Sequence, residues 1–354
     1  MSSVVFRSVS KSYGEVRALD RLDLAVEAQS FTVVCGPPKS GKSALFRSLV
    51  GLESIDEGII ELSGQDITNF PPARRPIGYV PQSFALYPHL TVYQNIGYPL
   101  TLAHVARDEI ARRIDRAAGI LSIGHLLNKT PDQLSGGEKQ RTAVARGLLK
   151  NASVFVLDDP LVGLDYKLRE QLMDDLKSLR EELKATFLYA TSDSLEALTM
   201  AQRLVVLDRG RVVQYDDADR VYHQPSHLRS LELIGFPHAN VINGHADATG
   251  RFASEALTFQ LPRPVRAGAV AVGFRPEAIK PEAGRPVEGR CRVRLIENLG
   301  GEIVVHLDAK GSPLIMSFPV SERAVPVFDS EIPFGLELGD ILLFDPADGR
   351  RLSD

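Results

Sequence analysis

The stretch FTVVCGPPKSGKSALFRSLVG, residues 31–51, contains a short apolar run, a glycine-containing loop and a helical pattern in direct succession. Its loop, GPPKSGKS at 36–43, fits the pattern G-x-x-x-x-G-K-[ST]. Between a strand and a helix, this pattern cradles phosphate oxygens with backbone N–H groups and the helix N-terminus. We therefore expect Lys42 to reach the β- and γ-phosphates of a nucleotide and the Ser43 hydroxyl to bind Mg²⁺. The other predicted phosphate-loop residues are Gly36, Lys39, Ser40, Gly41 and Ala44.

A second apolar run ends in two carboxylates: VFVLDDP, residues 154–160. A buried strand that ends in an aspartate can hold Mg²⁺ beside a nucleotide, so Asp158 is predicted to be a magnesium ligand. The runs TFLYA (186–190) and RLVVLD (203–208) repeat the short β-rich pattern, with helical stretches between them. Buried strands that alternate with helices indicate an α/β sheet with crossover helices.

The composition narrows the class of protein. The chain has 354 residues, 44% of them hydrophobic and 24% charged, with a net charge of −4, so nucleic acid is not an expected partner. Its two cysteines, Cys35 and Cys291, lie far apart, which argues against a disulfide framework and a zinc site. Because no apolar run approaches the ~20 residues of a membrane-spanning helix, the sequence predicts a soluble protein whose membrane role depends on partners.

The pattern of apolar, glycine and proline residues changes twice along the chain. A helical pattern without a strong strand candidate predicts a helical subdomain at about 89–150. Beyond residue 234, Gly and Pro separate short alternating runs such as EIVVHL (302–307), which indicates a small all-β domain. The expected domains are therefore 1–234 and 235–354.

The stretch LSGGEKQR, residues 134–141, resembles the signature of the ABC ATPases. Glycines leave room for a phosphate, a serine hydroxyl can bond it, and the following helix adds its positive end. The resemblance implies that the signature contacts the ATP held by the other subunit of a dimer. The residues expected to do so are Ser135, Gly136, Gly137 and Glu138.

Three further motifs resemble those of the same family and imply roles for single residues. Tyr13 in SYG would stack on adenine, so it joins the predicted ATP-binding residues. Gln82 would sense the γ-phosphate, contribute to the Mg²⁺ site and contact membrane subunits. Asp165 in GLD would lie at the dimer interface.

The rest of the chain resembles the maltose-type group of importer ATPases, which serve carbohydrate and polyol uptake. The stretches that carry this resemblance are ALYPHLTVYQNI (85–96), GFRPEAI (273–279) and LIENLGGEIVVHL (295–307). The resemblance implies an α/β P-loop ABC ATPase domain with a helical subdomain, followed by a small all-β, OB-like (TOBE-type) regulatory domain.

Several positions depart from the family pattern on one face of the nucleotide site. Asp159 stands where the family has a catalytic glutamate, and a carboxylate shorter by one methylene falls over an ångström short, a misplacement that can cost on the order of 100-fold. Ser192 stands where the family has a histidine, and a hydroxyl cannot act as an imidazole does. Pro38, Lys39 and Ala44 also replace the usual serine, glycine and threonine.

These departures, beside an intact signature, lead to a hypothesis about the assembly. The chain is expected to be the ATP-binding subunit of a bacterial ABC importer for a carbohydrate, polyol or glycerol-like solute. It would bind Mg-ATP at a degenerate site, and hydrolysis would occur mainly at the site of a second, distinct ABC ATPase subunit completed by this chain's signature. The other expected partners are two transmembrane permease subunits and, indirectly, a solute-binding protein, with the chain peripheral on the cytoplasmic side of the inner membrane.

Other interpretations stay open on the sequence alone. A homodimer with two slow sites fits the same residues, and a non-transport ABC protein is a further alternative. An OB-like domain could also bind oligonucleotides, but the arginines Arg263, Arg266 and Arg275 have few aromatic residues in register with them. The transported solute and any ligand of the C-terminal domain are not specified by the sequence.

Overall fold

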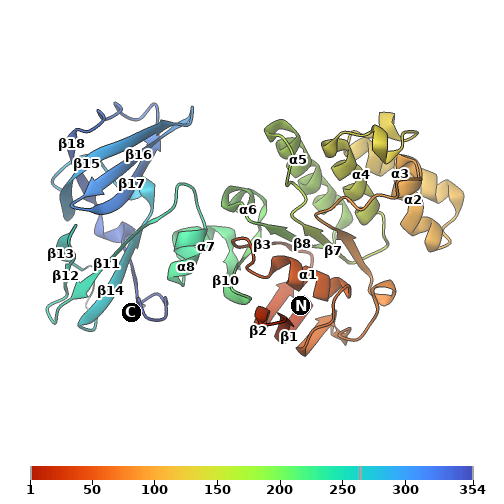
Figure 1. The fold of residues 1–354 in the computed structure, drawn as a ribbon, viewed down its shortest axis with the longest axis horizontal. Coiled ribbons are helices and arrows are strands. Elements are labelled where there is room, and N and C mark those ends of the chain that lie inside the picture. The colour runs from red at the N-terminus through yellow and green to blue at the C-terminus, as the bar shows by residue number, and fades with distance from the viewer. Residues whose placement is uncertain (1, 262, 264, 353–354) are drawn as a thin grey trace. The chain divides into compact units, whose positions relative to one another are not determined.

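The computed structural model of the protein describes residues 2–261, 263 and 265–352, and the backbone alone for Ser2 and 179–183. The chain divides into two compact units, Met1–Ala218 and Asp219–Asp354 (Figure 1). The first is an α/β unit and the second is mainly β. Among the described residues, no helix combines the length and the apolar character needed to cross a membrane.

The first unit is organised around a six-stranded sheet in the order β10-β9-β3-β8-β7-β6. Strands β9, β3, β8, β7 and β6 run parallel, and β10 pairs antiparallel with β9 at one edge. The runs predicted as strands from sequence occupy the interior of this sheet and are buried, as expected for strands covered on both faces. The strands are β3 Phe31–Cys35, β6 Ile77–Val80, β7 Val154–Asp158, β8 Thr186–Thr191, β9 Arg203–Asp208 and β10 Arg211–Asp217.

Helices connect these strands. Because β3, β8 and β7 run parallel, the carboxyl ends of β3 and β7 face the same edge, and α1 (Lys42–Val50) is the helix that follows β3 there. Parallel α/β sheets bind ligands at this edge. The remaining helices of the sheet region are α5 (Tyr166–Leu183) and α6 (Ser194–Met200).

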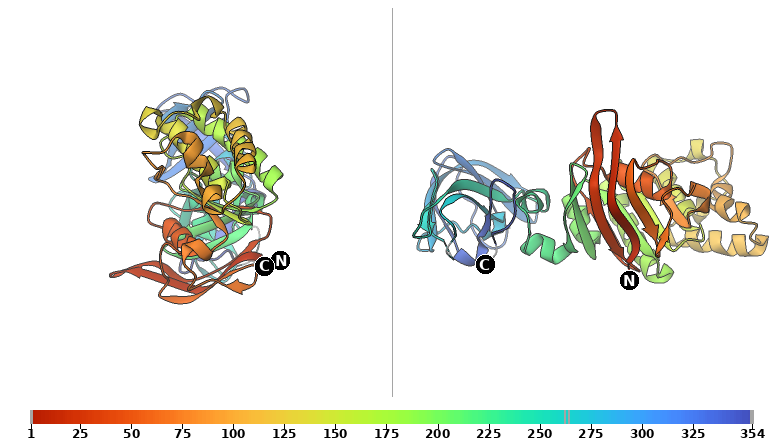
Figure 2. Two further views of the ribbon diagram at one scale, coloured as in Figure 1. Left: turned by 90° about the vertical axis from the view of Figure 1, so that its right-hand side faces the viewer. Right: turned by 90° about the horizontal axis from the view of Figure 1, so that it is seen from below.

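A second, antiparallel sheet in the order β2-β1-β4-β5 packs on α1, and no sequence pattern had predicted it. Its first two strands are 12 residues each and lie side by side (Figure 2, right). One buried cluster includes Phe6 of β1, Phe46 of α1 and Val156 of β7, so α1 is held between the two sheets. The strands are β1 Ser2–Tyr13, β2 Val16–Glu27, β4 Glu57–Leu62 and β5 Gln65–Asp66.

The helical subdomain is formed by α2 (Val92–Leu102), α3 (Arg107–Ile120) and α4 (Gly136–Leu148), which gather in one group in Figure 1. Thr91 begins α2 with a capping box, in which its hydroxyl accepts from the Gln94 N–H. The buried Arg141 of α4 donates to the Leu121 carbonyl at 2.7 Å and thereby fastens the end of α3.

The second unit contains two antiparallel sheets, in the orders β13-β12-β11-β14-β19 and β17-β16-β15-β18, that share one buried core. The all-β domain expected beyond residue 234 is therefore present. Short 3-10 turns follow β14 (Pro276–Ala278) and precede β19 (Leu338–Asp340). The strands are β11 Asn240–Ala246, β12 Arg251–Ala253, β13 Thr258–Gln260, β14 Gly268–Phe274, β15 Val287–Asn298, β16 Glu302–Ala309, β17 Ser312–Pro319, β18 Glu331–Leu336 and β19 Leu342–Phe344.

The division between the units falls earlier than the expected boundary at 234/235. The buried Arg275 explains the difference, because its guanidinium donates to the Tyr222 carbonyl at 2.7 Å and also to the carbonyls of Leu231 and Ile234. These contacts fasten α7 (Ala218–His223) and α8 (Leu228–Leu233) to the β unit. Arg275 is therefore occupied with backbone carbonyls.

Candidate nucleotide-binding site

The loop between β3 and α1 is built tightly around its glycines. A Cβ atom at Gly36 would lie 2.1 Å from the Leu207 carbonyl oxygen, and one at Gly41 would lie 2.4 Å from that of Ala18. Gly41 also has a φ of +110°, a conformation that favours glycine. The Ser40 hydroxyl is buried and has no hydrogen-bond partner among the described residues. A close-wrapped loop with an unsatisfied hydroxyl fits a phosphate-binding cradle.

Helix α1 begins without a side-chain cap, since its N-cap residue is Gly41. The first N–H groups of a helix have no partner within the helix, so this end is available to an anion. The Lys42 ammonium lies over the same loop and donates to the carbonyls of Gly36 at 2.7 Å and Pro37 at 3.2 Å. Burial lowers the pKa of Lys42, and nearby Asp159 opposes that change. The predicted lysine is therefore positioned at the loop.

Two of the predicted magnesium ligands meet at the carboxyl edge of the sheet. The Ser43 hydroxyl donates to Asp158 Oδ1 at 3.3 Å, although the two residues are 115 positions apart in the chain. Asp158 is 2% exposed, and burial raises the pKa of its carboxyl. A hydroxyl and a desolvated carboxylate side by side are a ligand pair that suits Mg²⁺. These residues fit the ion, which would neutralise phosphate charge between them.

Asp159 adopts a conformation unlike that of its neighbour. Its φ is +47°, and its N–H donates to the Ala190 carbonyl at 3.1 Å. The buried Oδ1 of Asp159 has no hydrogen-bond partner among the described residues. Burial raises the pKa of Asp159, and Lys42 opposes the rise. The structure places Asp159 beside Ser192 at the predicted nucleotide site, where both residues line one pocket.

A pocket of about 300 Å³ lies in front of these two residues. It is also lined by Arg169 and by Glu196, a carboxyl that is 6% exposed and whose pKa is raised by burial. Sequence reasoning missed Glu196 and also Tyr79, whose hydroxyl donates to Asp158 Oδ2 at 3.4 Å. No local pattern marks either residue, because each reaches the site through strand order and helix packing.

The remaining residues predicted at this site lie in different environments. Lys39 is exposed with a φ of +68°, and Ala44 is buried in α1. Tyr13 is 47% exposed at the end of β1, and its hydroxyl hydrogen-bonds to Glu53. Burial raises the pKa of Tyr13 to about 12. Gln82 is exposed two residues beyond the end of β6, the strand beside β7.

The signature begins α4 with a complete capping box. The Glu138 N–H donates to the Ser135 hydroxyl at 3.3 Å, and the Ser135 N–H donates to the Glu138 carboxylate at 2.7 Å. The Ser135 N–H also lowers the pKa of Glu138. A Cβ atom at Gly136 would have open space, whereas one at Gly137 would lie 2.7 Å from Leu168. Asp165 is an exposed cap of α5 that accepts from the Leu168 N–H at 3.0 Å.

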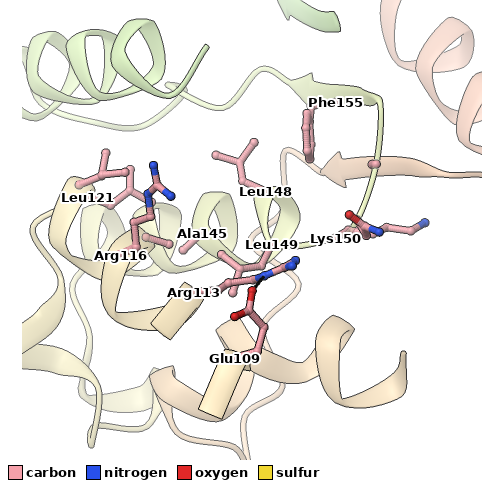
Figure 3. Close-up of a pocket in the computed structure, with 13 residues that line it drawn as sticks. Glu109, Arg113, Arg116, Leu121, Ala145, Leu148, Leu149, Lys150 and Phe155 are labelled. Atoms are coloured by element: carbon pink, nitrogen blue, oxygen red, sulfur yellow. Dashed lines mark hydrogen bonds and ion pairs between the residues drawn. The ribbon is translucent and has the colours of Figure 1, made fainter. Parts of the chain in front are cut away.

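A different pocket, of about 440 Å³, lies between α3, the end of α4 and β7 (Figure 3). Leu121, Leu148 and Phe155 provide apolar walls, and Arg113 pairs with Glu109 at its rim. None of the residues predicted to bind ATP or Mg²⁺ lines this pocket. It is therefore separate from the nucleotide-binding site.

The fold and this edge of the sheet define a P-loop nucleotide-binding protein. The sequence model of the family described as "ABC transporter" matches residues 19–162. The "sn-glycerol-3-phosphate import ATP-binding protein UgpC" of Ruegeria pomeroyi is 35% identical over all of both chains. The protein of that name in Rhizobium meliloti is 37% identical, and the "Sulfoquinovosyl glycerol transport ATP-binding protein SmoE" of Agrobacterium fabrum is 34% identical; each match covers 99% of this chain and the whole relative.

Two solved ABC-type structures resemble about two thirds of this chain. The ATP-binding cassette MJ0796, described as a dimer in a post-hydrolysis state bound to ADP and Pi, has a TM-score of 0.56 and 30% identity, covering 61% of this chain and 98% of that one. The cbiO1 protein from Clostridium perfringens has a TM-score of 0.58 and 26% identity, with 66% and 95% covered. The chain belongs to the ABC transporter family, as an ATP-binding protein. Its first unit binds ATP with Mg²⁺.

Proposed function

We propose that the chain is the ATP-binding subunit of an importer for a glycerol-containing solute, within the wider class of polyols and carbohydrates. The observation that carries the proposal is the extent of the similarity, which covers both units of this chain and the whole length of each relative. The relatives named after sn-glycerol-3-phosphate and sulfoquinovosyl glycerol both handle compounds with a glycerol unit. The non-transport alternative receives no such support.

The proposed assembly contains two transmembrane permease subunits and a solute-binding protein that delivers the cargo to them. The chain itself would lie at the cytoplasmic side of the inner membrane, bound to the permeases. ATP would be held by the phosphate loop, and Tyr13 and Gln82 would contact the adenine and the γ-phosphate. The signature residues and Asp165 would meet the ATP of the neighbouring ATPase subunit.

We further propose that the chain's own site hydrolyses ATP slowly. Support comes from the groups near the expected position of the γ-phosphate, where Asp159 is one methylene shorter than a glutamate and lines the same pocket as Ser192. The side chain of Ser192 offers a hydroxyl in place of an imidazole, which removes one proton-transfer group. In contrast, Ser135 and Glu138 retain a formed cap at the signature. A second, distinct ATPase subunit would then supply the faster site.

The composition of the native complex tests these proposals. Purification through a tag on this chain should recover permease subunits, a second ABC ATPase and a glycerol-compound-binding protein, identified by mass spectrometry. The isolated chain should bind Mg-ATP yet hydrolyse it far more slowly than the complex. A complex with two copies of this chain and brisk hydrolysis would exclude the division of labour and leave a homodimeric importer. Recovery of ribosomes or DNA instead of permeases would exclude the transport function.

A further inference from the structure

The loop that carries Gln82 is attached to the signature helix by one side chain, Arg146. From the last turn of α4, its guanidinium donates to the Ala85 carbonyl at 2.7 Å and to the Phe84 carbonyl at 3.2 Å. The guanidinium carbon also lies 5.4 Å from the centre of the Tyr87 ring, within the range of a cation–π contact. A planar fork with two donors holds a backbone segment in one orientation, which a single donor does not.

The held segment is a constrained piece of chain. Ala85 has a φ of +48°, a left-handed conformation that is costly for a residue with a side chain and requires surrounding contacts. Beyond it, the fully buried Asn95 of α2 accepts from the Tyr87 N–H at 2.8 Å and donates to the Leu90 carbonyl at 3.0 Å. The Tyr87 and Tyr98 rings are 4.7 Å apart. The loop after Gln82 is therefore bound to the helical subdomain on both sides.

Gln82 stands between this attachment and the nucleotide edge of the sheet. It follows β6, which pairs with β7, the strand that ends in Asp158. Gln82 lies two positions before Phe84 and three before Ala85, so a displacement of the held segment must move Gln82 as well. At the other end of α4, about 16 Å away at the helical rise, Ser135 forms the signature cap.

We propose that Arg146 is a positioning residue that couples the two nucleotide sites of the assembly. Through Arg146, the loop that carries Gln82 and the helix that begins at Ser135 move together. A displacement of Gln82 at the chain's own ATP is therefore passed to Ser135 at the partner's ATP. The inference rests on the proposed function, because it gives a slowly hydrolysing site a role: the ATP held there sets the position of the signature at the other site. Coupling of this kind is reciprocal in binding free energy.

Hydrogen exchange of the full chain, measured by mass spectrometry, tests the coupling directly. Saturating Mg-ATP should slow exchange about 5-fold or more in the first turn of α4, read from a peptide spanning 134–148, although this turn is not part of the chain's own phosphate loop. In Arg146→Ala the slowing should fall below about 2-fold, while the affinity for Mg-ATP stays within about 3-fold. Arg146→Lys, which keeps the charge without the fork, should give an intermediate result.

The matched control is Arg141→Ala. Arg141 is also an arginine of α4 that donates to a backbone carbonyl, that of Leu121; it is buried, whereas Arg146 is half-buried, and it does not contact the Gln82 loop. This variant should keep the slowing even where its thermal stability falls further than that of Arg146→Ala. Loss of the response in both variants would overturn the proposal, because general loosening of α4 would then explain it.

Two other results would also overturn the coupling. One is a slowing in Arg146→Ala equal to that of the unaltered chain, and the other is the lack of any response to Mg-ATP in the unaltered chain. If Arg146→Ala does not fold, Arg146→Lys decides, because a reduced slowing at unchanged Mg-ATP affinity supports the coupling and a full slowing overturns it. Failure of the proposed function is recognised separately, by the ATPase rate and the composition of the native complex.

Discussion

Two helices of the first unit, α1 and α4, begin in opposite ways. The N-terminus of α1 follows Gly41 and has no side-chain cap, so its N–H groups and Lys42 face the phosphate loop. The N-terminus of α4 is closed on itself by the reciprocal bonds of Ser135 and Glu138. The first end is built to receive a ligand from its own unit, and the second has its cap hydrogen bonds formed without another subunit. Departures from the family pattern gather at the first end.

The difference has a chemical meaning for Ser135. A hydroxyl that accepts from the Glu138 N–H still has its own proton to donate, so the cap can remain formed while a phosphate oxygen is bound. The signature therefore needs no rearrangement to act. At the phosphate loop, by contrast, Lys42 must leave the carbonyls of Gly36 and Pro37 to reach a phosphate.

The largest expected effect comes from restoring the family's residues at the two catalytic positions, 159 and 192. Restoring both groups in Asp159→Glu with Ser192→His should raise the ATPase rate of the chain about 100-fold, because the carboxylate regains its reach and an imidazole returns. The measurement is steady-state phosphate release at saturating Mg-ATP. The matched control is Asp159→Asn with Ser192→His, which lacks the base and should stay slow. An unaltered chain that is already as fast as the repaired one would contradict the proposed degeneracy.

Removing the lysine at the loop should give the next largest effect. Lys42→Ala is expected to weaken Mg-ATP binding roughly 10- to 100-fold, since a charge-assisted hydrogen bond contributes about 1.5–3 kcal/mol. The measurement is titration with a fluorescent ATP analogue. Lys39→Ala, which removes an exposed lysine from the same loop, should change the affinity much less. Equal losses in both variants would mean that net loop charge, not the position of Lys42, holds the nucleotide.

A smaller effect is expected from removing the charge of Glu138 in the signature. Glu138→Gln keeps a capping-box side chain but removes a negative charge beside the turn that meets the partner's phosphate. Charges near a helix end contribute about 0.3–1 kcal/mol, so the apparent KM for ATP of the assembled transporter should fall about 2- to 5-fold. Ser135→Ala is the contrasting variant and should raise it. A rise in KM for Glu138→Gln would show that the carboxylate itself takes part in binding.

The smallest expected effect concerns the backbone of the phosphate loop. Lys39 holds a φ of +68°, where a side chain is strained and glycine is not. In urea unfolding, the free energy of unfolding of Lys39→Gly should be about 0.5–1 kcal/mol higher than that of Lys39→Ala. The gain is reduced because glycine has the larger entropy in the unfolded chain. If Lys39→Ala proves the more stable of the two, the left-handed conformation is not strained.

Much of the nucleotide site could be predicted because its signals are local. The apolar run 31–35, the loop after it and α1 are consecutive, and the strands 154–158 and 203–208 are short runs of β-prone residues. The magnesium pair followed from two such motifs, Ser43 and Asp158. The family resemblance then supplied the signature, whose cap also forms within four consecutive residues.

The sequence by itself therefore determined the α/β class, the phosphate loop, the signature and the all-β second unit. Only the tertiary structure decided the antiparallel sheet on α1, the early unit boundary set by Arg275, and the contacts of Tyr79 and Arg146. The physical reason is the distance along the chain over which the contacts act. Periodicity and turn chemistry report the conformation of neighbouring residues, whereas the Arg275 and Arg146 guanidinium groups and the Tyr79 hydroxyl have partners 53 to 79 positions away, where no local pattern records them.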